Sequence, residues 1–211
     1  MTKNHKTISD KIHDRLNEAN LLRLQKRFDE ALTVYQDCIQ KYGKNVEILA
    51  MIAFVKFCRA FEDPNETGET YHIVIAELKD ALALEPNNFK LHAYLAEVYS
   101  LGTLNYELAA EEYRYAIELN PANAFILFGA ASLYGLPDEV ISLDEAIQWM
   151  EEAIMLSPDN PDYYVRLGYL YKDASRMTDA QQIWIQSLLC STPLEAEYAE
   201  SVIHEIRNLA V

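Results

Sequence analysis

Histidine and cysteine side chains are spread along the chain without the spacing that a metal site needs. Five histidines occur, at positions 5, 13, 72, 92 and 204. No two of them have the separation found on zinc-binding helices. Cys38, Cys58 and Cys190 are odd in number and form no Cys-x-x-Cys pair. Because each cysteine falls in an apolar helical pattern, we expect no metal site, but buried free thiols in a reducing cytoplasm.

Carboxylates are the most abundant reactive groups, with 33 Asp and Glu against 18 Lys and Arg. Adjacent pairs such as Glu111–Glu112 and Glu151–Glu152 are expected on solvent-exposed helix faces. Acid–base catalysis instead needs two carboxyl groups in a cleft with separated pKa values. The sequence also lacks a P-loop, a G-x-G-x-x-G motif, a G-x-S-x-G motif and a His-Glu-x-x-His motif. We therefore expect neither an enzyme nor a bound cofactor.

The formal net charge of -15 is unevenly distributed. Residues 1–60 contain 11 basic residues (Lys and Arg) and 7 acidic residues (Asp and Glu). Residues 61–211 contain 7 basic and 26 acidic residues. This balance argues against nucleic acid and against anionic lipid as ligands, because both attract basic proteins. The acidic part either keeps the protein in solution or attracts a basic partner.

No segment of the sequence indicates export or membrane insertion. The N-terminal sequence MTKNHKTISDKIHD has no apolar run after its lysines, so no signal peptide is expected. No stretch reaches the 18 apolar residues of a membrane-spanning helix. We expect a cytoplasmic protein.

An internal repeat organises the chain. Three similar segments occur, LALEPNN (82–88), IELNPAN (117–123) and IMLSPDN (154–160). Before the second and third segments lies a helical pattern of alanine, a large residue and a small residue, as in Ala109, Tyr113 and Ala116. Spacings of four and three residues place these side chains on one helix face. The pattern predicts the second helix of a repeated unit.

A second helical pattern precedes the first one in each unit. It contains a pair of residues, often small, followed by an aromatic residue, as in Leu167-Gly168 and Tyr171. Small residues within a helix allow a neighbouring helix to approach closely. Each unit is thus predicted to be a pair of antiparallel helices that buries its apolar faces only by stacking on neighbouring units.

These patterns resemble the tetratricopeptide repeat (TPR), a helix-turn-helix unit of about 34 residues. The resemblance implies an all-α fold, a right-handed TPR superhelix (α-solenoid) of antiparallel helix pairs in a single domain, 1–211. Its predicted parts are repeats 12–45, 46–88, 89–123, 124–160 and 161–194, a capping helix 193–210 and an exposed loop 62–69. Helix starts are predicted from capping boxes at Ser142–Glu145 and Thr178–Gln181 and from a cap at Thr192.

The resemblance also implies that the first helix of each unit lines a concave face. Projecting the sequence onto that face places Asn20 and Arg23 there in the first repeat. The partner-binding side chains expected on the other repeats are Met51, Phe54, Lys90, Tyr94, Glu97, Phe125, Phe128, Arg166 and Tyr169. Aromatic anchors of this kind favour a protein or peptide segment with large apolar side chains.

The sequence favours a non-enzymatic adaptor or scaffold that holds a partner polypeptide in this groove. The expected partner segment is apolar with basic flanks. Two alternatives stay open at this point. One is a specialised chaperone that shields apolar client segments, similar to the acidic TPR chaperones of type III secretion. The other is a structural subunit of a larger assembly.

Overall fold

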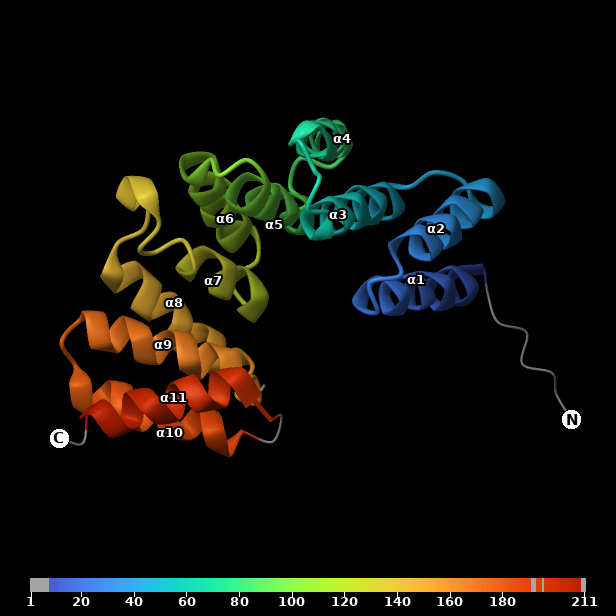
Figure 1. Cartoon of the computed structure of the whole chain (residues 1–211). Helices are drawn as coiled ribbons and strands as arrows, with labels where there is room; N and C mark the ends of the chain where they lie inside the picture. Colours follow the sequence, from blue (N-terminus) through green and yellow to red (C-terminus); the bar gives the residue numbers. More distant parts are fainter. Residues whose placement is uncertain (1–7, 191–192, 195, 210–211) are drawn as a thin grey trace, which may run out of the picture. The chain divides into compact units, whose positions relative to one another are not determined.

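The computed structural model describes residues 8–190, 193–194 and 196–209, and in these residues it contains eleven α-helices and no β-strand (Figure 1). The predictions of an all-α fold and of eleven helices are confirmed. Contacts divide the chain into two compact units, residues 1–104 and 105–211. The assignment of the whole chain to a single solenoid domain stays a prediction. None of the described helices has the length and apolar composition needed to cross a membrane.

The first unit is built from helices that pack against their neighbours in sequence. α1 packs on α2, α2 on α3, α3 on α4 and α4 on α5. The helices are α1 (Ile8–Leu24), α2 (Phe28–Tyr42), α3 (Val46–Glu62), α4 (Glu69–Leu84) and α5 (Phe89–Glu97). α5 continues directly into one π-helical turn, η1 (Val98–Gly102). Packing between sequence neighbours is the arrangement that a helical solenoid requires.

The second unit repeats this arrangement. Its helices are α6 (Tyr106–Leu119), α7 (Ala124–Ala131), α8 (Leu143–Leu156), α9 (Pro161–Asp173), α10 (Met177–Leu189) and α11 (Ala196–Leu209), with a short 3₁₀ turn, η2 (Pro137–Glu139), before α8. Each of these helices again contacts the next one along the chain. α11 packs against α10 and buries Val202 completely.

Asparagine side chains cap the start of five of the eleven described α-helices, two in the first unit and three in the second. Asn45, Asn88, Asn105, Asn123 and Asn160 each stand immediately before a helix, and each side chain accepts a hydrogen bond from a backbone N–H of the first turn. These caps satisfy N–H groups that have no partner within the helix. The asparagines that end the segments 82–88, 117–123 and 154–160 are therefore helix signals as well as turn residues.

One predicted capping box is confirmed and one is wrong. Ser142 and Glu145 exchange both bonds of a capping box at the start of α8. α10 instead begins at Met177, before the predicted cap at Thr178. Ser175 has a positive φ of 59°, which turns the chain early, and Arg176 then pairs with Asp179 at 2.7 Å. The cap predicted at Thr192 lies outside the described residues.

A small residue on one helix receives a large aromatic ring from the next helix at the centre of the second unit. Trp184 of α10 is fully buried and its indole N–H donates to the Val165 carbonyl at 3.2 Å. A Cβ atom at Gly168 would lie 2.1 Å from the Trp184 ring. At Gly129 of α7, a Cβ atom would likewise lie 2.6 Å from the Tyr113 hydroxyl. The predicted close approach at Gly168 is thus present.

The connection between α3 and α4 is short and exposed. Residues 63–68 join the two helices, within the loop predicted at 62–69. Its turns are closed by its own carboxylates: the backbone N–H of Asn65 donates to Asp63, and the backbone N–H of Gly68 donates to Glu66, both at 2.9 Å. The loop therefore holds its shape by local bonds.

We expect Gly168→Ala to destabilise the second unit by about 2–3 kcal/mol, because the added methyl group overlaps the buried indole. Gly135→Ala is the matched control, since nothing lies within 4 Å of a Cβ atom there and only the positive φ of 81° is strained. That control should cost about 1 kcal/mol. Urea unfolding followed by circular dichroism measures both, and equal losses would contradict the close packing.

Candidate functional site

The first unit brings together side chains of α1, α3 and α5. The rings of Phe54 and Tyr94 stack with centroids 4.3 Å apart and planes at 18°. Phe54 is buried, with 8% of its surface exposed, whereas Tyr94 is half-buried. Phe54 is therefore the inner ring of this stacked pair, and Tyr94 is the outer ring, which stays partly exposed. Stacked aromatic pairs of this kind are stabilised beyond the burial of their area.

Arg23 of α1 covers the same ring. Its guanidinium carbon lies 5.3 Å from the centroid of the Phe54 ring, within the range of a cation–π interaction. The guanidinium Nε and Nη2 both donate to the Oδ1 atom of Asn20, at 3.1 and 3.0 Å. These contacts hold the cation in place at the edge of the surface.

Tyr94 also contacts Met51 of α3. The Tyr94 hydroxyl donates to the Met51 sulfur at 3.4 Å. Burial raises the pKa of Tyr94 to about 12, with a smaller contribution from the Glu97 carboxylate. Tyr94 therefore stays neutral at physiological pH. Its ring and the Met51 side chain give this surface an adaptable apolar patch.

Glu97 lies one helical turn after Tyr94 on α5. Its side chain is half-buried, and none of the described residues donates a hydrogen bond to its carboxylate. Burial raises the pKa of Glu97 to about 7, and Arg23 opposes this shift. The Cys58 thiol of α3 is a third group near this carboxylate, and burial raises the pKa of that thiol as well.

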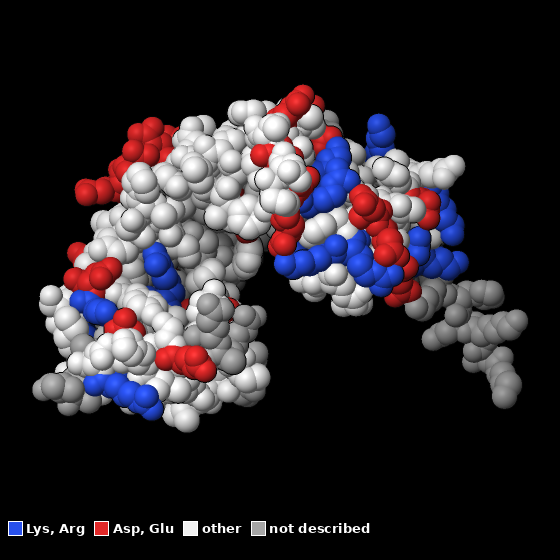
Figure 2. All heavy atoms as spheres, viewed as in Figure 1, with Lys and Arg blue, Asp and Glu red and all other residues white. Residues whose placement is uncertain are grey.

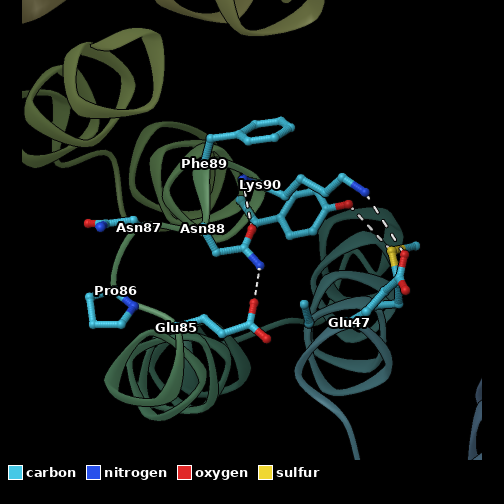
Figure 3. A pocket seen from close by; sticks show the side chains of 10 residues that line it. Glu47, Glu85, Pro86, Asn87, Asn88, Phe89 and Lys90 are labelled. Atoms are coloured by element: carbon cyan, nitrogen blue, oxygen red, sulfur yellow. Dashed lines mark hydrogen bonds and ion pairs between the residues drawn. The ribbon is translucent and has the colours of Figure 1, made fainter. Parts of the chain in front are cut away.

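A pocket of about 690 Å³ adjoins the patch (Figure 3). Figure 3 shows it between α3 and the turn that leads into α5. Lys90 and Glu47 stand across it with a separation of 3.9 Å, and the Asn88 amide donates to Glu85 at 2.7 Å. Its lining residues are Glu47, Ala50, Met51, Glu85, Pro86, Asn87, Asn88, Phe89, Lys90 and Tyr94. Met51 and Tyr94 thus belong to both the patch and the pocket.

The second unit has its own exposed aromatic surface. Phe125 of α7 is 51% exposed. Phe128 is half-buried, and its ring lies 5.2 Å from the ring of Tyr163 on α9. Phe125 is therefore free to contact another molecule, whereas Phe128 is partly used for packing between helices.

Arg166 and Tyr169 of α9 are engaged in the fold of the second unit. The Arg166 Nη2 donates to the carbonyl oxygens of Ala131, Ser132 and Tyr134, at 3.2, 3.4 and 2.9 Å. It thereby caps the C-terminal end of α7, where helix carbonyls lack partners. Burial lowers the pKa of Arg166.

The ring of Tyr169 meets the ring of Trp184 edge-on at 5.1 Å, and its hydroxyl lies 3.2 Å from the Ser201 hydroxyl of α11. The Tyr169 side chain is half-buried. It therefore links α9, α10 and α11, and its contacts are those of a residue that holds the fold together.

Solved structures with a similar arrangement of helices include TPR proteins. The structure matches TTC0263, a thermophilic TPR protein of Thermus thermophilus, with a TM-score of 0.69 and 19% identity, over 93% of this chain and 99% of that one. The chain has the TPR fold. YrrB, a TPR protein with an unusual peptide-binding site, matches with a TM-score of 0.58 and 18% identity, over 90% of each chain.

A third TPR-fold neighbour is MamA 41-end from Desulfovibrio magneticus RS-1. It matches with a TM-score of 0.55 and 19% identity, over 96% of this chain and 98% of that one. No protein-family model and no curated protein matches the sequence. The similarity to TPR proteins is therefore a similarity of fold.

Some side chains of the predicted partner-binding face lie together, and their role in binding stays a prediction. In the first unit, Met51, Phe54 and Tyr94 contact one another directly, and Lys90 and Glu97 flank them on α5. The sequence analysis missed the turn 85–89, which closes the pocket. The signal was present, since Asn88 caps α5 and thereby places the preceding turn beside the first residues of that helix.

The raised pKa of Glu97 makes stability depend on pH. The folded chain holds a proton on Glu97 up to about pH 7, whereas the unfolded chain releases it near the ordinary value of 4.5. Between these values the folded state binds more protons, so the free energy of unfolding falls as pH rises. The full effect is on the order of 3 kcal/mol as an upper bound.

We therefore expect Glu97→Gln to be more stable than the wild type at pH 8, by up to about 3 kcal/mol, and similar to it at pH 5. Urea unfolding at the two pH values measures this difference. Asp80→Asn, which removes a carboxylate from an exposed position of α4, is the control and should change neither value. A Glu97→Gln variant that is less stable at pH 8 would show that the carboxylate has a partner in solution.

Proposed function

We propose that this TPR-fold chain is a non-enzymatic interaction module that holds a segment of a partner polypeptide on α3 and α5 of its first unit. The observation that carries the proposal is the Phe54–Tyr94 stack beside a pocket of about 690 Å³. A site of this size takes one or two large side chains of a peptide. The peptide-binding site of the TPR protein YrrB supports the same use of the fold.

The chemistry of the surface suits a peptide with apolar anchors. Tyr94 offers a ring that is held rigidly by Phe54 beneath it, so little side-chain freedom is lost on binding. Met51 offers a flexible apolar side chain that adapts to different anchors. Polar groups at the rim, among them Asn87 and Lys90, can bond to the peptide backbone.

The charges of the second unit favour basic flanks in a partner segment that reaches it, whereas the first unit is close to balanced. Residues 1–104 carry 13 Lys and Arg and 15 Asp and Glu, whereas residues 105–211 carry 5 and 18. On the face shown in Figure 2, Lys and Arg gather over the N-terminal helices together with Asp and Glu. An acidic field attracts a basic partner and raises its association rate. We place this interaction in the cytoplasm, where the three free cysteines would stay reduced.

A chaperone for apolar client segments is the second candidate, and the exposure of Phe125 in the second unit favours it. An adaptor selects one kind of sequence, whereas a chaperone accepts many apolar segments. Selection from a phage-displayed library of random dodecapeptides separates the two. An adaptor yields a shared motif, and a chaperone yields apolar peptides without one.

We expect Tyr94→Ala and Met51→Ala each to weaken binding of a selected peptide about tenfold or more, because both line the site. Titration calorimetry measures the affinity, and circular dichroism confirms that the variants are folded. Tyr198→Ala of α11, where the ring is 55% exposed, is the matched control and should bind normally. Folded Tyr94→Ala and Met51→Ala proteins with wild-type affinity would refute the site.

The second unit is proposed to offer a separate contact through Phe125 and Phe128. If a selected peptide uses it, Phe125→Ala should weaken binding by about 2 kcal/mol, as expected for an aromatic hot spot. Raising the salt concentration should slow association and leave dissociation nearly unchanged, because salt screens the acidic field. Stopped-flow kinetics measures both rates. Peptides that lose affinity only with Tyr94→Ala would confine binding to the first unit.

A further inference from the structure

The carboxylate of Glu97 is the feature that the proposed function leaves unused. It stands on the last turn of α5, one turn beyond Tyr94, and is half-buried. Charged and titratable groups face it from three helices: Arg23 of α1, Cys58 of α3 and Tyr94 of α5 itself. Within the described part of the chain, no side chain or backbone group donates a hydrogen bond to it.

Arg23 does not serve as its ion-pair partner in the structure. The guanidinium is held by the Asn20 amide oxygen and by the Phe54 ring. Among the described residues, no salt bridge joins Arg23 to Glu97, although the two are close enough for Arg23 to favour the ionised carboxylate. The Arg23 cation and the Glu97 carboxyl group thus lie near the stacked rings without pairing.

An unpaired carboxylate in this position costs stability. Burial removes water from the charged group, and no protein donor replaces it. A leucine side chain would avoid that cost, and a glutamine side chain would avoid the part that comes from the charge. An unpaired buried group that lowers stability is expected at a binding site. There the ligand supplies the hydrogen-bond donor that the protein lacks.

We propose that Glu97 binds the ammonium or guanidinium group of a lysine or arginine in the partner segment, beside the Tyr94 ring. This inference rests on the proposed function and assigns the chemistry of one position of the partner. A cation supplies both the charge and the hydrogen-bond donors that the carboxylate lacks. The long apolar stem of either side chain packs against the half-buried Tyr94 ring, as such stems do on apolar surfaces.

The arrangement makes recognition depend on pH. A bound cation favours the ionised carboxylate, so binding releases the proton that the free protein holds on Glu97 near neutral pH. Affinity for a lysine-containing segment is then full above about pH 8 and is lost as pH falls through about 7. The Cys58 thiol does not add a transition in this window, since burial raises its pKa.

The test uses a histidine-free dodecapeptide selected from a displayed library on the full wild-type chain. The selected peptides are expected to share a lysine or arginine at a constant distance from their apolar anchor. For a lysine-containing peptide, a second peptide carries norleucine at that position, which keeps the stem and removes the charge. At pH 8, the wild type should bind the lysine peptide about tenfold or more tightly than the norleucine peptide.

Glu97→Gln should bind the two peptides with equal affinity, while Asp80→Asn should keep the full difference. The wild-type affinity for the lysine peptide should fall between pH 8 and pH 6, and this fall should be absent with the norleucine peptide and with Glu97→Gln. The inference is overturned if the wild type does not distinguish the two peptides, or if Glu97→Gln still does.

The two proposals fail in different ways. If selected peptides depend on Tyr94 and Met51 but not on a cation at Glu97, the cation subsite is wrong and the peptide-binding surface stands. A backbone N–H of the peptide would then be the donor to the carboxylate. If no selected peptide depends on Tyr94 or Met51, the surface itself is wrong and the inference falls with it.

Discussion

The close approach of paired helices is the constraint on which the rest of the molecule depends. It is achieved by placing a small residue on one helix opposite a large ring on its neighbour. Gly168 and Gly129 leave no room for a Cβ atom, because the Trp184 ring and the Tyr113 hydroxyl fill that space. Gly102 does the same for the Tyr71 ring at the end of η1. Helices held this closely form a rigid support for the side chains that project from them.

The aromatic surface of the first unit also depends on closely packed helices. Phe54 and Tyr94 come from helices that are not adjacent in sequence, and Arg23 comes from a third. The three side chains stack because the backbones of α1, α3 and α5 are already in place. Glu97 stands on the same helix as Tyr94, one turn further on, and none of the described residues donates a hydrogen bond to its carboxylate.

Much of the fold could be predicted because its signals are local. The alanine and aromatic spacing reports helix faces directly, and Ser142 with Glu145 marks a helix start within four residues. The helix start at Thr178 was predicted wrongly because Ser175 has a positive φ. A serine in the sequence does not indicate such a backbone conformation. The site was harder to predict, because the burial of Phe54 depends on Arg23 and Tyr94 from other helices. The capping of α7 by Arg166, 32 to 35 residues away in sequence, has no local signal at all.

The loop between α3 and α4 has a practical consequence. Asp63 closes its first turn from within, whereas Glu66 closes the second turn and also accepts a hydrogen bond from the backbone N–H of Thr70 in the first turn of α4. Exposed, polar segments of this kind tolerate foreign residues and are accessible to enzymes that act on chains. The loop is therefore a suitable attachment point for a fluorescent group or a ligase tag. A label there would follow the protein in a cell without occupying the Tyr94 surface.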